Sequence, residues 1–213
     1  VAVYIMWSIF TFALGLRYAM PTSANIRQFA ETILSIGMVF ILSDLLRNPK
    51  MLRRLILVIL MAVGAQAVVA IGLYAAPDQL AENILVRLAR IGYPNGGVIR
   101  YIEDNPELGE RAIGTWVDPN ALGGILAISA VMIAPQIVSK KPIIPYRWLT
   151  FGIFGAVGLA LFLSSSRASF LAFGAGLTVI AFVRYRKVIP VMILSGMLFL
   201  LLPQTQNYID RLF

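Results

Sequence analysis

The feature that most constrains this chain is a single arginine inside a long apolar run. Between Leu149 and Val183, Arg167 is the only charged residue. An unpaired cation at the depth of a bilayer costs about 3 kcal/mol or more, and the run is too long for one membrane helix, which needs roughly 20 residues. Both constraints are met if two spanning helices meet at a short turn, Ser164–Ser169, that holds Arg167 at the membrane edge.

The composition extends this interpretation to the whole chain. Hydrophobic residues make up 59% of the 213 residues and charged residues 13%, and the mean hydropathy of +0.83 is far above that of an ordinary globular domain. The apolar runs are continuous and not alternating, which argues against a β-barrel. We therefore expect an all-α fold, a polytopic transmembrane helix bundle.

Polar breaks divide the sequence into about seven predicted spans, which together form one transmembrane domain covering residues 1–213. The chain begins inside an apolar run and ends soon after another, so we expect an internal fragment that is truncated at both ends. The predicted spans are Val1–Leu16, Phe29–Leu46, Leu55–Ala76, Ala121–Val138, Trp148–Ser164, Ala168–Val183 and Val188–Leu202.

The distribution of lysine and arginine predicts the topology. Three alternate breaks, Arg47–Arg54, Lys140–Arg147 and Arg184–Lys187, carry ten of the eighteen cations and belong in the cytoplasm. The net charge of +8 is thus explained by topology and by contact with anionic membrane lipids, not by nucleic-acid binding. The long break at residues 77–120 then becomes an extracytoplasmic loop.

This loop has its own predicted structure. Asp78 is placed to cap a short amphipathic helix that is suited to lie at the membrane interface. Val98–Glu103 and Glu110–Thr115 are predicted to pair as a hairpin. The apolar positions of the short helix recur at helical spacing at Leu80, Ile84, Leu85, Leu88 and Ile91.

Glycines recur about one turn apart in the fifth predicted span. Small residues at that spacing let two helices approach closely inside a membrane. These glycines therefore mark a face of the fifth span where another helix can approach: Gly152, Gly155 and Gly158.

The stretch Arg111–Asn120, which leads into the fourth span, is the second informative one. Asp118 and Asn120 are placed to cap the helix, and a helix N-terminus at the membrane surface attracts anions. Two plain alternatives stay open: a well-capped helix start, and an Arg111 that only pairs with Glu107 or Glu110.

The two stretches together resemble the O-antigen ligase and O-antigen polymerase family. The first carries Arg-x-x-Gly-Thr-x-x-x-Pro-Asn at the start of a membrane helix, and the second carries Ser-Arg-Ala between two later helices. The residues that carry the resemblance are Arg111, Gly114, Thr115, Pro119, Asn120, Ser166, Arg167 and Ala168.

The resemblance implies a metal-independent, cofactor-free glycosyltransferase at the periplasmic face of the bacterial inner membrane. It would move a glycan from an undecaprenyl-pyrophosphate carrier to an acceptor hydroxyl on lipid A core or on another glycan. Arg167 and Arg111 are the candidate catalytic residues, because a guanidinium binds phosphate oxygens through two donors and stays charged. The candidate substrate-binding residues are Ser166, Thr115, Asn120 and, as a third cation, Arg211.

The sequence does not identify the general base that would activate the acceptor hydroxyl. In ligases of this family a loop histidine is thought to activate the acceptor, and this sequence contains no histidine. Either the base lies beyond Phe213, or a carboxylate replaces it, with Asp118, Glu103 and Glu110 as the options.

Two other functions also fit the sequence. A transporter of a small anion should carry polar residues at mid-membrane, and the middle spans hold few of them: Gln66, Ser129 and Thr178. A non-catalytic membrane scaffold would tolerate replacement of both Arg167 and Arg111.

Overall fold

The computed structural model describes residues 1–91 and 93–200, and most of these residues are helical. The α-helices are α1 (Ala2–Gly15), α2 (Ser23–Leu45), α3 (Pro49–Ala75), α4 (Asp78–Val86), α5 (Pro119–Val138), α6 (Arg147–Leu163), α7 (Arg167–Val183) and α8 (Ile189–Leu200). Single 3-10 turns cover Arg87–Ile91, Ile102–Asp104, Pro106–Leu108 and Arg186–Val188. The two strands are β1 (Arg100–Tyr101) and β2 (Glu110–Arg111).

Among the described residues, three helices are long and apolar enough to span a membrane: α2, α3 and α5, with 23, 27 and 20 residues. The apolar helices α1, α6 and α7 are shorter, with 14, 17 and 17 residues. This composition is consistent with a membrane protein. The last two residues of the seventh predicted span, 201–202, lie outside the described residues.

Two helices, α2 and α3, begin before the apolar runs that predicted them. α2 begins at Ser23, not Phe29, because the Thr22 hydroxyl accepts a hydrogen bond from the Asn25 N–H at 3.2 Å and caps the helix. α3 begins at Pro49, where the Asn48 side chain accepts from the next backbone N–H groups. Hydropathy marks where a helix is apolar, whereas a cap marks where it starts.

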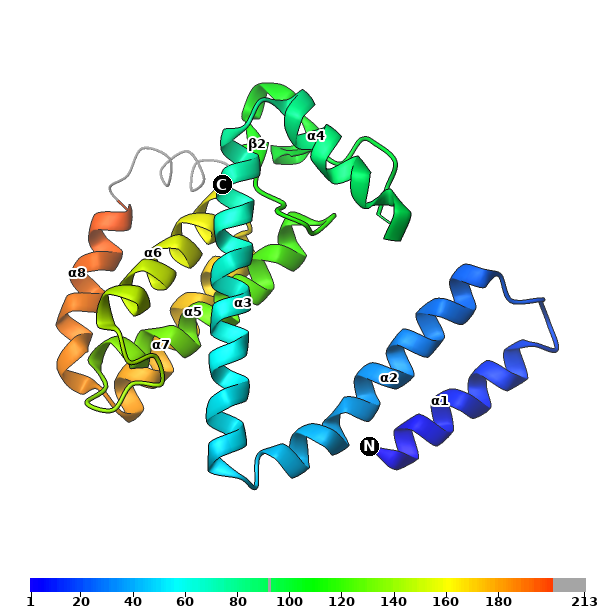
Figure 1. The fold of residues 1–213 in the computed structure, drawn as a ribbon, viewed down its shortest axis with the longest axis horizontal. Coiled ribbons are helices and arrows are strands. Elements are labelled where there is room, and N and C mark those ends of the chain that lie inside the picture. The colour runs from blue at the N-terminus through cyan, green and yellow to red at the C-terminus, as the bar shows by residue number, and fades with distance from the viewer. Residues whose placement is uncertain (92, 201–213) are drawn as a thin grey trace. The chain divides into compact units, whose positions relative to one another are not determined.

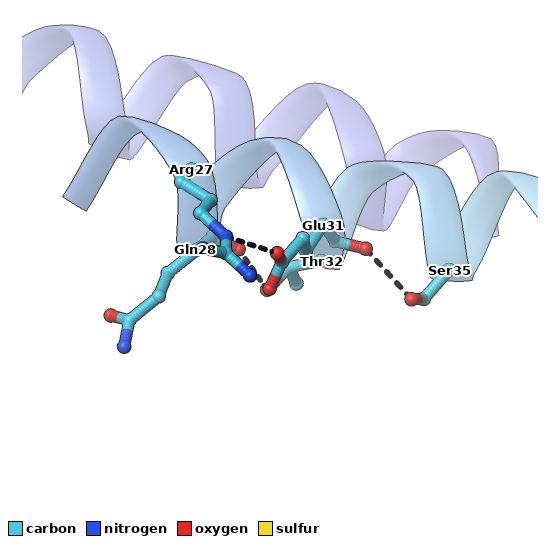
Figure 2. A network of polar contacts seen from close by, with 5 residues as sticks. All are labelled: Arg27, Gln28, Glu31, Thr32 and Ser35. Carbon is cyan, nitrogen blue, oxygen red and sulfur yellow. Dashed lines mark hydrogen bonds and ion pairs between the residues drawn. The ribbon is translucent and has the colours of Figure 1, made fainter. Parts of the chain in front are cut away.

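The chain divides into two compact units, residues 1–56 and residues 57–213. In the first unit, α1 and α2 run side by side (Figure 1), and the rings of Phe12 and Phe29 stack with centroids 4.0 Å apart. Figure 2 shows the polar end of α2, where Arg27 Nε donates to Glu31 Oε1 at 2.7 Å and Ser35 Oγ donates to the Glu31 carbonyl. This charged pair therefore neutralises itself along one helix face.

The second unit is built around α5, which packs against both α6 and α7. Its side chains Leu122, Leu126 and Ile133 are fully buried. Large apolar residues on the outer faces of this unit stay exposed, among them Trp148, Leu171 and Val183. A broad apolar exterior of this kind is typical of a surface that contacts lipid or another protein.

Among the described residues, no atom occupies the glycine face of α6, so the prediction that another helix can approach it stays a prediction. A Cβ atom added at Gly152, Gly155 or Gly158 would meet nothing within 4 Å. Close approach occurs elsewhere: Gly64 of α3 lies against Ile153, and Gly176 of α7 lies against Val131. Spacing alone shows that a helix face is smooth, but not whether a partner occupies it.

The segment between α3 and α5 folds over the C-terminal end of α3, where Figure 1 shows α4 and β2. Ala81 and Leu85 of α4 are buried with Leu73, Val98 and Ile113. A fully buried leucine or valine contributes about 1.5–3 kcal/mol, so this small cluster fixes α4 in place. Leu80 and Ile84, which were expected on the same apolar face, are exposed at 51% and 44%.

The predicted hairpin is present but short. β1 and β2 pair antiparallel, with Arg100 opposite Arg111 and Tyr101 opposite Glu110. The expectation that Asp78 caps α4 was wrong, because the N-cap is Pro77. The Asp78 carboxylate instead accepts a hydrogen bond from the Tyr101 hydroxyl at 3.1 Å.

Candidate functional site

The turn Ser164–Ser166 joins α6 to α7 and carries Arg167 as the first residue of α7. Ser165 has a φ of 51°, the left-handed conformation that commonly ends a helix but favours glycine. The chain can therefore reverse direction within three residues. The sequence-based prediction of two apolar helices joined by a very short turn is confirmed.

Three serine side chains at this turn are buried and hydrogen-bonded within it. Ser164 Oγ donates to the Leu161 carbonyl at 2.7 Å, and the hydroxyls of Ser166 and Ser169 bond each other at 2.8 Å. All three residues are buried against α5, where a Cβ at Gly123 would lie 2.7 Å from Ser169 Oγ. Small side chains with satisfied hydroxyls let α5 approach the turn.

Arg111 ties the hairpin to the end of α6. Its Nε donates to the Ser164 carbonyl at 2.9 Å, and its Nη2 lies 3.5 Å from the Ser165 carbonyl. The N–H of the next residue, Ala112, donates to the Leu163 carbonyl at 2.9 Å. Carbonyls at a helix C-terminus lack intrahelical partners and carry partial negative charge, so a cation there is stabilising.

The same arginine also reaches α5. Arg111 Nη2 donates to Asn120 Oδ1 at 2.8 Å. The start of α5 is capped by Asp118, whose Oδ1 accepts from the Asn120 N–H at 2.9 Å. Asp118 is thus the cap that was predicted, while Asn120 is a partner of Arg111 and not a cap.

Arg167 is held much more loosely. Its Nη2 lies 3.5 Å from Glu103 Oε1, and the two side chains are 44% and 56% exposed. An exposed ion pair of this length contributes about 0–1 kcal/mol. The guanidinium of Arg167 is therefore free to exchange its partner for a stronger one.

These groups surround one pocket of about 370 Å³. Two arginines and one glutamate give its lining a formal charge of +1. The first residues of α7 belong to the wall, and α7 has no side-chain N-cap, so the positive end of its helix dipole adds to the field. The lining residues are Ile102, Glu103, Arg111, Asn120, Ser165, Arg167 and Ala168.

The structure thus brings Arg167, Arg111 and Asn120 together, but not the other candidate residues. Ser166 is 1% exposed and points its hydroxyl at Ser169. Thr115 Oγ1 donates to Gln66 Oε1 of α3 at 3.0 Å and does not line the pocket. Arg211 lies outside the described residues. Substrate binding by these three residues stays a prediction.

The fold places the three carboxylates that are candidates for the general base in different surroundings. Glu103 lines the pocket, and Asp118 is engaged at the α5 cap. Glu110 is paired with Tyr101 on β1. Side chains of neighbouring strand residues point to opposite faces, so the Glu110 side chain lies on the opposite face of the hairpin from that of Arg111. Burial, and secondarily the charge of Asp78, raises the pKa of Glu110 to about 7.

Sequence reasoning missed Ser165 as a wall of the pocket. Its carbonyl faces Arg111, and its backbone, not its side chain, makes the contact. A left-handed serine inside an apolar run leaves no signal in the sequence beyond a local break in hydropathy.

A larger hollow of about 520 Å³ lies in the first unit, beside α1 and α2. Its lining includes Thr11, Phe12, Asn25 and Phe29 but no ionisable side chain. It therefore offers no charge for an anionic substrate, and the arginine pocket is the stronger candidate site.

Comparison with known proteins gave no relative: no protein-family model matches the sequence, and neither the curated proteins nor the solved structures include a match.

Proposed function

We propose that this chain is part of an integral-membrane glycosyltransferase that moves a glycan from an undecaprenyl-pyrophosphate carrier to an acceptor hydroxyl, as O-antigen ligases and polymerases do. One observation carries the proposal. Arg111 and Arg167, which come from two separate motifs of the family resemblance, line one pocket.

The pocket suits the chemistry of that donor. Transfer of the glycan leaves negative charge on a pyrophosphate. Preorganised cations that stabilise this developing charge lower the activation free energy by several kcal/mol. Arg111 is fixed by hydrogen bonds to Ser164 and Asn120, so its charge is preorganised. Arg167 is exposed and weakly paired, so its planar fork can bind phosphate oxygens through two donors.

We also propose which helices span the membrane and on which side the long loop lies. We assign the apolar helices α1, α2, α3, α5, α6, α7 and α8 as the seven spans, and residues 77–120 as a loop on the periplasmic side of the bacterial inner membrane. The support is the concentration of lysine and arginine in alternate breaks. An α-helix of 17 residues is about 26 Å long, a little less than a bilayer core of about 30 Å, so α6 and α7 fit with the turn at one surface.

The proposal is tested by replacing Arg167 with alanine and with lysine in the full-length protein in membranes. The readout is glycan transfer from an undecaprenyl-pyrophosphate-linked donor. We expect Arg167→Ala to lose about 100-fold or more in rate, the size of effect seen when one stabilising donor is removed. Arg167→Lys should also lose activity, because an ammonium cannot replace the two-donor fork.

Arg90→Ala is the matched control, since Arg90 is an exposed arginine in the loop of residues 77–120 and does not line the pocket. It should transfer glycan at the rate of the unchanged protein. Full activity in both Arg167 variants would refute the assigned role.

An anion transporter remains the second candidate, and one observation favours it. Gln66 Nε2 and Ser129 Oγ are buried within α3 and α5 and have no hydrogen-bond partner among the described residues. Buried polar groups in apolar helices often mark a pathway. Ser129→Ala discriminates the two functions: a transporter should lose solute uptake, whereas a glycosyltransferase should keep its transfer rate. A scaffold would keep every function in the Arg167 variants.

A further inference from the structure

We propose that Glu103 is the general base of the arginine pocket and takes the proton from the acceptor hydroxyl. This inference rests on the proposed glycosyl transfer and names the residue that would complete its chemistry. Glu103 is the one carboxylate among the described residues that line the pocket, and the whole sequence contains no histidine that could serve instead.

The position of Glu103 is set by an unusual backbone. Glu103 has φ 55° and ψ 28°, and Asp104 also has a φ of 55°. A left-handed conformation costs a non-glycine residue about 1–2 kcal/mol, and two in succession persist only where neighbouring contacts hold them. Those contacts are present: the Ile102 N–H donates to the Gly109 carbonyl at 3.0 Å, and the Asn105 side chain accepts from the Glu107 N–H at 3.0 Å.

The ion pair with Arg167 couples proton uptake by Glu103 to binding of the donor. In the free pocket the carboxylate and the guanidinium are 3.5 Å apart and partly exposed. A pyrophosphate offers charged oxygens that bind a guanidinium more strongly than this long pair does. When the pyrophosphate takes the donors of Arg167, Glu103 loses its cation and acquires an anion as a neighbour. An anion beside a carboxylate favours its protonated form, which makes it a better proton acceptor.

The step balances without any further reactant. The acceptor oxygen forms a bond to the anomeric carbon of the donor sugar while the bond from that carbon to the pyrophosphate oxygen breaks. The proton of the acceptor hydroxyl moves to the Glu103 carboxylate, and the pyrophosphate leaves with the bonding electron pair. Arg167 and Arg111 stabilise the charge on the leaving group, and Glu103 releases its proton to solvent afterwards.

The experiment compares Glu103→Gln with the unchanged full-length protein in membranes. Glutamine keeps the shape of the side chain but cannot accept a proton, so we expect glycan transfer to fall about 100-fold or more. Binding of inorganic pyrophosphate, used as the probe for the anion site, should stay equal or become tighter, because Arg167 no longer has a competing carboxylate.

Asp104→Asn is the matched control, because Asp104 is the neighbouring carboxylate with the same left-handed backbone and does not line the pocket. Asparagine is well tolerated in that conformation. This variant should transfer glycan at the unchanged rate and bind pyrophosphate normally.

Each contrary result has a distinct meaning. If the unchanged protein transfers glycan and Glu103→Gln does so equally well, Glu103 is not the base. If Glu103→Gln loses pyrophosphate binding together with activity, the residue shapes the pocket and the inference is overturned. If the unchanged protein binds pyrophosphate but transfers no glycan, the proposed function fails, and the assignment of a base fails with it.

Discussion

Arg111 and Arg167 are the same residue type beside the same pocket, but their surroundings differ. Arg111 donates to the Ser164 carbonyl and to Asn120, and it is half-buried, whereas Arg167 makes one long pair and stays exposed. Hydrogen bonds from a charged donor contribute about 1.5–3 kcal/mol each. Replacement of Arg111 therefore removes structure together with charge, and Arg167 gives the cleaner test of function.

Glu110 provides a prediction for the pH dependence of stability. Its pKa is raised by burial and by Asp78 from 4.5 to about 7 in the folded protein. The folded state then binds more protons than the unfolded state between about pH 4.5 and pH 7, so the free energy of unfolding should fall as pH rises through that window. Glu110→Gln should remove this part of the slope, as measured by thermal unfolding at several pH values.

The control for this prediction is Glu107→Gln, which makes the same charge change at an exposed residue of the same loop. Its pH profile should keep the slope of the unchanged protein. A Glu110→Gln profile with the original slope between pH 4.5 and pH 7 would contradict the interpretation.

At the scale of elements, the contact between α5 and the α6–α7 turn decides the geometry of the pocket. Gly123 of α5 faces the buried serines, and a methyl group there would lie 2.7 Å from Ser169 Oγ and 2.8 Å from Ser166 Cβ. Because both neighbours are buried and hydrogen-bonded, they have little room to move. The turn, and with it the position of Arg167, depends on this close approach.

We predict that Gly123→Ala destabilises the protein by about 1–3 kcal/mol, the usual cost of overpacking a closed interior. Gly124→Ala is the control, since no atom of the part of the chain that the structure describes lies within 4 Å of a Cβ at that position. It should be neutral or stabilising by up to about 1 kcal/mol, because alanine favours a helix. Thermal unfolding in one detergent measures both, and equal stability of the two variants would contradict the packing argument.

The elements themselves were largely predictable. The apolar runs marked each of the helices α1, α2, α3, α5, α6, α7 and α8, and turn residues marked the hairpin. However, α2 and α3 begin at Ser23 and Pro49, well before the predicted Phe29 and Leu55. The errors arose from contacts that a sequence does not display. Asp78 was expected to cap α4, but its carboxylate accepts a hydrogen bond from Tyr101 instead.

At the scale of the whole molecule, the prediction concerns which loops face which side of the membrane. The sequence has no cysteine, so single cysteines can be introduced without background. Asn95→Cys, in the long loop, should react with a membrane-impermeant maleimide in intact cells. Lys140→Cys, in a basic break, should react only after lysis, because it is assigned to the cytoplasm.

The unchanged chain, which offers no thiol, is the control for specificity. Reaction of both cysteines in intact cells, or of neither, would contradict the proposed topology. Both positions are exposed in the structure, so a failure to react reports the membrane barrier and not burial in the protein.

The sequence by itself determined the helical class, the places of the apolar helices and the two motifs that hold Arg111 and Arg167. These depend on local patterns: hydropathy, caps and turns act over a few residues. Only the tertiary structure decided that both arginines line one pocket, that Ser166 is buried, and that Glu103, not Glu110, is the carboxylate at that pocket. Such choices depend on how helices rotate and pack against each other and, for Glu110 and Arg111, on the register of β2, where a shift of one residue exchanges the two faces.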